Sequence, residues 1–342
     1  MSDENRLRVK KLASNIREKG SRLQTDRAKA GDLEYFWAWA NLAYDLSESY
    51  PVDSTIILDF VASHLEGEFP EGIEEKLVDM KIKADYGPHK LTTVRRRIST
   101  LSWQHKVLGF NGEKNPTMNA EVANTLKHAA NDSGNAARPS TAALKLTLDA
   151  VLDSIQGDDL HSIRDRALIM VSWQSGRRRS ETVGMKLEHR ISSVLATNET
   201  PAYYIFAFPA LKNRSRTDTP LTVKIGGRTK EALDAWINAS GIKEGHIFRG
   251  IRKGGKTVLK KPITGTQVYR IVKKRFFSAG IDNWETYTPH SFRSGFVTEL
   301  GKRNMSVGDG MAMTGHKSLQ TFMGYYQQGG AETNTAADML DN

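Results

Sequence analysis

Cysteine is absent from the 342 residues of this chain. Its absence excludes disulfide bonds, thiolate metal ligands and cysteine nucleophiles, and it fits a reducing compartment. The sequence also lacks any apolar run near the roughly 20 residues that a membrane-spanning helix needs. Its first residues, MSDENRLRVKK, are too polar for a signal peptide. We therefore expect a cytoplasmic protein that makes no membrane contact.

Acidic residues are too few to balance the basic ones. Asp and Glu number 39 against 49 Lys and Arg, so the formal net charge is +10. A soluble protein this basic usually meets a polyanion, and the alternative explanation is colloidal solubility. With 39% hydrophobic residues, the chain is long enough for two domains that each bury a core.

The first half of the chain has the pattern of an all-helical domain. Apolar residues at helical spacing predict helices near residues 33–50, 54–65, 74–84, 91–109 and 117–132. Pro51 ends the first of these, and Asp53 or Ser54 can cap the second. The small, polar stretch that follows, interrupted by Pro139, indicates a linker. We predict a flexible basic arm at 1–28, a helical domain at 29–133 and a linker at 134–142.

The second half mixes helices with short strands. Helices are expected near 140–155, 161–176, 228–239, 264–279 and after His290, and strands near 202–208 and 219–225, with a basic turn between the strands. The predicted fold class is mainly α, with a small antiparallel β-sheet in a second domain at 143–342.

Basic and hydroxyl-bearing side chains form an ordered series in this second half: Arg178, Lys212, His290, Arg293, His316 and Tyr325. Phosphoryl transfer spreads negative charge over the non-bridging oxygens, which two guanidinium groups match well. A nucleophile must lose a proton and a leaving oxygen must gain one. A tyrosine serves as the nucleophile if cations and a base help it to ionise. The series supplies each of these parts.

The order and spacing of these residues resemble the tyrosine recombinase (phage integrase) family. SGRRRSE is similar to the family's box with an arginine and a glutamate three residues on, which selects Arg178 and Glu181. Lys212 lies eight residues before Pro220, as in the family's β-hairpin. His290 and Arg293, the Gly-His pair at His316, and Tyr325 nine residues later match the remaining boxes. The two-domain plan is most like that of the Cre recombinases.

The resemblance implies a role for each residue. Tyr325 attacks the scissile phosphate to form a 3′-phosphotyrosine, while Arg178 and Arg293 hold the non-bridging oxygens. His316 donates a hydrogen bond to the phosphate and His290 assists proton transfer from the tyrosine. Lys212 is the general acid for the leaving 5′ oxygen, and Glu181 supports the site. No metal or other cofactor is expected, because the arginines take the place of a cation.

Some matches leave a choice open. Arg177 and Arg179 flank Arg178, and only the distance to Glu181 selects among the three. Tyr326 follows Tyr325, and only the nine-residue spacing separates them. The family's Leu-Gly-His is Thr-Gly-His here, and a serine follows Arg293 where the family often has histidine. Arg214 and Arg216 surround Lys212, so a plain DNA-binding turn is an alternative for that lysine.

The resemblance also implies partners. We expect double-stranded DNA with an inverted-repeat recognition site, bound by a homodimer, and a homotetramer when two sites pair. The tail at 329–342 is expected to break from the tyrosine's helix at Gly329-Gly330 and to contact a neighbouring subunit. A nucleoid-associated protein of prokaryotic, phage or plasmid origin is expected. On the fourth predicted helix, one face is expected to enter the DNA, through Lys90, Thr92, Arg96 and Thr100; a solvated helix face is the alternative.

Three other functions are alternatives. A type IB topoisomerase shares the residue set but acts without site choice, and a DNA-binding regulator would use a catalytically silent version of the same scaffold. A P-loop NTPase is suggested by residues 250–257, GIRKGGKT, which satisfy the Walker A pattern. A P-loop needs a helix starting at Lys256-Thr257, and the β-branched residues and Pro262 that follow argue against one. A basic hairpin near DNA is expected there instead.

Overall fold

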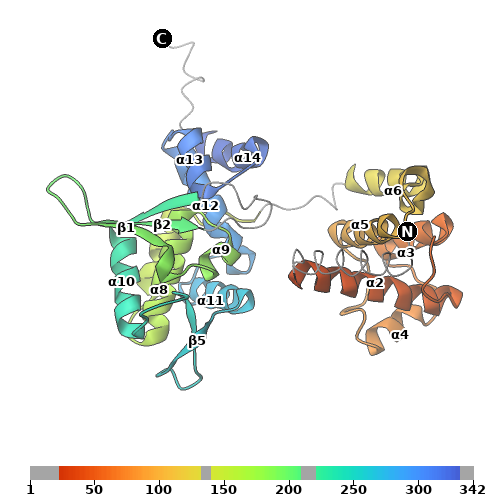
Figure 1. The fold of residues 1–342 in the computed structure, drawn as a ribbon, viewed down its shortest axis with the longest axis horizontal. Helices are drawn as coiled ribbons and strands as arrows, with labels where there is room; N and C mark the ends of the chain where they lie inside the picture. The colour runs from red at the N-terminus through yellow and green to blue at the C-terminus, as the bar shows by residue number, and fades with distance from the viewer. Residues whose placement is uncertain (1–22, 132–139, 209–220, 332–342) are drawn as a thin grey trace, which may run out of the picture. The chain divides into compact units, whose positions relative to one another are not determined.

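The chain divides into two compact units, Met1–Arg138 and Pro139–Asn342. The structure, a computed structural model, describes residues 23–131, 140–208 and 221–331. Figure 1 shows both units and labels most of their helices and strands. No helix within these three ranges is both long enough and apolar enough to span a membrane.

The first unit is a bundle of helices, as the sequence predicts. Its members are α2 (Leu23–Tyr44), α3 (Ser54–Glu66), α4 (Ile73–Asp79), α5 (Leu91–Val107) and α6 (Ala120–Asn131). Asp53 caps α3 by accepting a hydrogen bond from the Thr55 amide at 2.7 Å. The core is aromatic and aliphatic, with Trp39, Phe60 and Val94 fully buried.

The first helix differs from the expectation at both ends. It begins at Leu23, so residues 23–28, assigned to the flexible arm, are helical. It ends at Tyr44, before the predicted stop at Pro51. The polar residues of its first turns give no apolar periodicity, which explains why the pattern located the helix too late. The rest of the arm lies outside the described residues.

The second unit combines helices with two small antiparallel sheets. Strands β1 (Arg190–Val194), β2 (Tyr203–Phe208) and β3 (Leu221–Gly226) form one sheet in that order, with Ile205 opposite Lys224. The buried side chains of β2 and β3 pack against α8 (Leu160–Ser175) and α10 (Arg228–Ser240) (Figure 1). The other helices are α7 (Lys145–Ser154), α9 (Arg179–Val183), α11 (Gly265–Ser278), α12 (Pro289–Lys302), α13 (Val307–Thr314) and α14 (Leu319–Gly330).

A second sheet is the hairpin of β4 (Arg249–Ile251) and β5 (Val258–Pro262). It contains the segment with the Walker A pattern. The Arg252 amide donates to the Thr257 carbonyl at 2.9 Å, which closes a turn, and Lys256 and Thr257 lead into β5. A P-loop requires a helix at that point. The hairpin therefore confirms that this segment does not cradle a nucleotide in the P-loop manner.

Helices α12 and α14 pack closely because glycines face the contact. A Cβ added to Gly329 would lie 1.8 Å from the Thr298 carbonyl oxygen, and one added to Gly301 would lie 2.0 Å from the Tyr326 carbonyl oxygen. Helix α14 continues through Gly330, so the glycine pair does not interrupt the helix where the sequence suggested a break. Gly329 instead lets the two backbones touch, and this contact fixes the helix that carries Tyr325. Residues 332–342 lie outside the described part.

We predict that Gly329→Ala destabilises the second unit by about 1–3 kcal/mol or more, because the new methyl group forces the two helices apart. Gly324→Ala is the matched control on the same helix, since no atom lies within 4 Å of its added Cβ. That change should be neutral or stabilising by up to about 1 kcal/mol. Urea unfolding of both variants tests the difference. Equal stability of the two variants would contradict the packing role.

Candidate active site

Arg293 is the centre of the candidate site. It lies on α12 and is only 2% exposed. Its Nη1 donates to the Gly176 carbonyl at 2.7 Å and to the Thr314 carbonyl at 2.5 Å. These bonds join α12 to the ends of α8 and α13, so one guanidinium holds three segments in place. Its Nη2 is buried without a hydrogen-bond partner in the described part of the chain.

The turn between α8 and α9 supplies the second cation. Arg178 forms the N-cap of α9, and Nη1 of its half-exposed side chain lies 3.2 Å from Oε1 of Glu181. The other carboxylate oxygen of Glu181 accepts from the Arg178 amide at 3.2 Å. Glu181 is itself buried. It therefore holds Arg178 through both the backbone and the side chain.

The three adjacent arginines have different surroundings. Arg177 is buried, with its guanidinium 5.2 Å from the centre of the Phe208 ring. Arg179 lies against Gly265, since a Cβ there would come within 2.8 Å of its Nε. Arg178 has the half-exposed side chain and lies near enough to His290, Arg293 and His316 to lower the pKa of each. The geometry therefore favours Arg178, the residue that the spacing to Glu181 selects.

The two tyrosines are in different environments as well. The Tyr325 ring lies beside the His290 imidazole, with 6.2 Å between ring centres. The Tyr326 hydroxyl donates to the Met305 carbonyl at 2.6 Å, and its ring stacks on Phe322. Tyr326 therefore has a structural contact for its hydroxyl, while Tyr325 is the one that lies next to a base.

His316 follows the C-cap of α13. Gly315 takes a left-handed conformation (φ 67°) at this cap. A Cβ there would lie 2.7 Å from Nη1 of Arg177 and 2.8 Å from Leu221, so only glycine fits before His316. Nδ1 of His316 lies 2.7 Å from Oγ1 of Thr314. The sequence did not predict Thr314 as a site residue. The threonine in place of the family's leucine before Gly-His could have indicated it.

The site is strongly cationic, and its pKa values reflect this. Burial, with a further contribution from Arg178, lowers the pKa of Arg293 to about 10, so the group remains charged at neutral pH. Desolvation by the surrounding protein, together with the charges of Arg293 and Arg178, lowers the pKa of His316 to about 3. The same three causes lower the pKa of His290. Both imidazoles are therefore neutral at pH 7 in the protein without DNA.

Lys212 and its neighbours Arg214 and Arg216 lie outside the described residues. Among the described ones, no group of three or more His, Cys, Asp or Glu side chains is placed to hold a metal ion. The unit thus brings together Arg178, Glu181, His290, Arg293, His316 and Tyr325 from four separate segments. This cluster combines cations, neutral imidazoles and a hydroxyl, the types of group that phosphoryl transfer requires.

Helix α5 of the first unit presents part of the expected DNA-facing set. Lys90, Thr92 and Arg96 are exposed. Thr100 is buried instead and donates to Oδ2 of Asp32 at 3.0 Å. Its side chain is therefore unavailable to a base edge, and the helical spacing failed to show this because Asp32 comes from α2. Arg96 also pairs with Asp32, which offsets part of the charge on this face.

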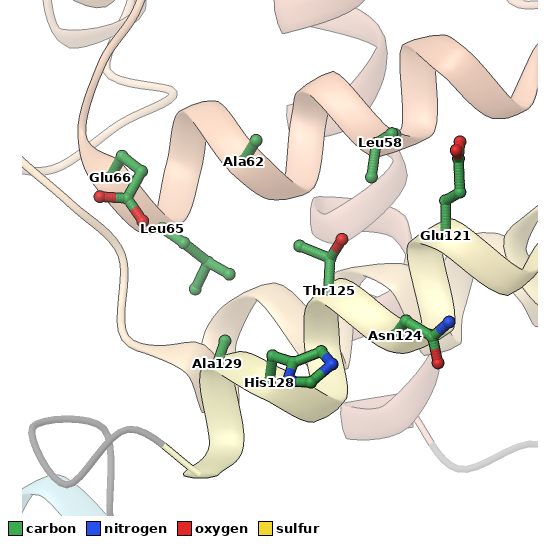
Figure 2. A pocket seen from close by; sticks show the side chains of 9 residues that line it. All are labelled: Leu58, Ala62, Leu65, Glu66, Glu121, Asn124, Thr125, His128 and Ala129. Atoms are coloured by element: carbon green, nitrogen blue, oxygen red, sulfur yellow. The ribbon is translucent and has the colours of Figure 1, made fainter.

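A groove of about 650 Å³ lies between α3 and α6 of the same unit (Figure 2). Its floor is apolar, with Leu58, Ala62 and Leu65 on α3, and Glu66 and Glu121 flank it. None of the predicted catalytic or DNA-contacting residues lines it. Its two carboxylates make it an unsuitable surface for a phosphate backbone.

The helical first unit and the α-rich second unit with small antiparallel sheets have the fold that the sequence predicts. Arginines, histidines and a tyrosine gather in the second unit. The phage integrase family profile matches residues 144–331, more than half of the chain. The chain therefore belongs to the phage integrase family of tyrosine recombinases, the class of enzyme that the sequence predicts.

Known relatives agree with this assignment. The integrase/recombinase xerD homolog of Selenomonas ruminantium is 26% identical over 257 residues, which cover 74% of this chain and 73% of the relative. Tyrosine recombinase XerC 1 of Ralstonia nicotianae is 23% identical over 185 residues, and the chain spans about half the length of that relative (53%). The Tn1549 transposon integrase, solved in complex with transposon right end DNA, has the same fold, with a TM-score of 0.55 and 16% identity over 95% of this chain and 98% of that one.

Proposed function

We propose that this chain cleaves and rejoins DNA strands at a specific site through a 3′-phosphotyrosine formed by Tyr325. The observation that carries the proposal is the free Nη2 donor of buried Arg293. A buried guanidinium with an unused donor is costly unless an anion completes it. The neighbouring Arg178 supplies a second cation, and two guanidinium groups suit the non-bridging oxygens of a phosphate.

The chemistry exchanges one phosphodiester for another. The Tyr325 oxygen forms a bond to phosphorus as the bond from phosphorus to the 5′ oxygen breaks. The tyrosine proton passes to the neutral His290, and the leaving 5′ oxygen takes a proton from Lys212. A second 5′-hydroxyl later reverses these steps on the phosphotyrosine. Because the covalent link conserves the bond energy, rejoining needs no ATP.

DNA is the partner that this chemistry requires. We assign phosphate contact to Lys90 and groove contact to Thr92 and Arg96, and we leave buried Thr100 out of the set. The proposal further includes dimers on inverted half-sites and strand exchange in a homotetramer. These assemblies rest on the resemblance of the catalytic series to the family.

A nicked duplex tests the proposal, because loss of the short strand after cleavage traps the covalent complex. Footprinting on the DNA that flanks the protein's own gene supplies the site. We expect an SDS-resistant adduct with a free 5′-hydroxyl, and binding that weakens steeply with salt. Binding without any adduct would indicate the silent regulator. Relaxation of supercoiled DNA without site preference would indicate the topoisomerase.

The pH dependence of cleavage should show His290 acting as the base. Since desolvation, Arg293 and Arg178 lower the pKa of His290, the neutral form persists below pH 6.5 and is lost only as pH falls through this lowered value. The acid limb of single-turnover adduct formation should therefore begin below pH 6.5. His290→Gln should be slower and should lack this acid limb. An acid limb that begins above pH 6.5 would contradict the assignment.

A further inference from the structure

Thr314 occupies the place where the family's Gly-His box usually has leucine. Its side chain is fully buried at the end of α13. Its carbonyl accepts from Arg293 at 2.5 Å, and its hydroxyl oxygen lies 2.7 Å from Nδ1 of His316. One residue therefore touches two members of the candidate site, through backbone and side chain.

The Thr314 hydroxyl has one proton and can donate it to only one of its two contacts. Oγ1 of Thr314 donates to the Gly310 carbonyl at 2.7 Å. A carbonyl cannot donate, so the single proton of this hydroxyl lies on that contact. The bond to His316 must then run the other way, from Nδ1–H to Oγ1. The imidazole is thereby held as the tautomer with its proton on Nδ1.

This tautomer determines what the opposite ring nitrogen offers. In the neutral ring Nε2 carries a lone pair, and it becomes a donor only when the ring is protonated. A non-bridging phosphate oxygen accepts hydrogen bonds and repels a lone pair. We infer that Thr314 is a positioning residue that fixes the Nδ1–H tautomer of His316, so that His316 contacts the phosphate only after it has taken up a proton. The inference rests on the proposed function for the identity of the anion.

The groups around His316 determine under which conditions its ring takes up this proton. Desolvation disfavours a cationic ring most, and Arg293 and His290 on α12 and Arg178 at the start of α9 act in the same direction. A phosphate between the arginines reverses the balance, because a nearby anion favours the protonated form. Docking of the DNA backbone is then coupled to uptake of one proton from solvent, and release of the phosphate returns it.

The tautomer is tested without any reaction. Nitrogen-15 NMR of histidine-labelled full-length protein, free of DNA, distinguishes a protonated Nδ1 from a protonated Nε2. We expect protonated Nδ1 at His316 in the wild type and in Thr314→Ser, which keeps the hydroxyl. Thr314→Val keeps the buried shape and removes the acceptor, and we expect it to shift the proton to Nε2. Protonated Nε2 in the wild type, or no change in Thr314→Val, would overturn the inference.

The pH profile of adduct formation on the nicked duplex gives the second readout. The wild-type rate should fall about tenfold per pH unit above the pKa of His316 in the DNA complex, because only the protonated ring donates. Thr314→Ser should keep this alkaline limb. Thr314→Val should lose it, since its neutral ring already donates from Nε2. A Thr314→Val variant that is slowed equally at every pH would show a purely structural role and overturn the inference. Absence of any wild-type adduct would instead count against the proposed function and leave the tautomer result standing.

Discussion

Tyr325→Phe should abolish the covalent DNA adduct while leaving DNA binding intact. Tyr325 lies beside His290 and is the only proposed source of the attacking oxygen. Without that oxygen no phosphotyrosine forms, and loss of a covalent nucleophile lowers the rate by a factor on the order of 10⁶. The nicked duplex followed by SDS electrophoresis measures the adduct, and a mobility shift measures binding.

Tyr326→Phe is the matched control from the neighbouring position. It removes a hydroxyl that donates to the Met305 carbonyl and keeps the ring that stacks on Phe322. We expect adduct formation within a few-fold of the wild type and a stability loss of about 1 kcal/mol. An adduct that survives in Tyr325→Phe and disappears in Tyr326→Phe would overturn the choice of nucleophile.

Arg293→Lys should lose both cleavage and stability. A lysine presents a point charge and cannot keep the bonds to the Gly176 and Thr314 carbonyls while also reaching a phosphate. Loss of a donor to the developing charge costs about 10²–10³-fold in rate. Carbonyls left without their donor cost about 1–3 kcal/mol of folding free energy. Adduct kinetics and urea unfolding measure the two effects separately.

Arg178→Lys separates the catalytic loss from the structural one. Arg178 is half exposed and pairs only with Glu181 among the ion pairs described for it, and exposed pairs contribute about 0–1 kcal/mol. Arg178→Lys should slow cleavage about as much as Arg293→Lys does. It should leave the free energy of unfolding nearly unchanged. If Arg293→Lys is as stable as Arg178→Lys, the bracing role of Arg293 is wrong.

Much of the fold follows from local sequence patterns. Apolar periodicity located all five helices of the first unit and the main helices of the second, because each packs one apolar face on a core. Strands β2 and β3 followed from β-branched and aromatic runs. Strand β1 and helices α9 and α13 were missed, since they are short and their residues are stabilised mainly by neighbours from elsewhere in the chain.

Three expectations differ from the structure, two of them for reasons of packing. Thr100 looked like a surface residue by helical spacing, but Asp32 on α2 buries it with a hydrogen bond. Gly329 was expected to break a helix, and the close approach to Thr298 shows it permitting contact between two helices instead. The first helix begins at Leu23 rather than near Leu33, because polar residues carry no periodic signal.

The sequence by itself determined the family, the fold class and the order of the site residues, because chemistry at a phosphate restricts which residue types serve and the family keeps their spacing. Tertiary structure decided the surroundings of each residue. It placed Tyr325 beside His290 and bound the Tyr326 hydroxyl to a carbonyl. It buried Arg177 and left Arg178 partly open, and it joined Thr314 to both Arg293 and His316. Many of these contacts link residues that are far apart in the chain, so they cannot be predicted from spacing along the sequence.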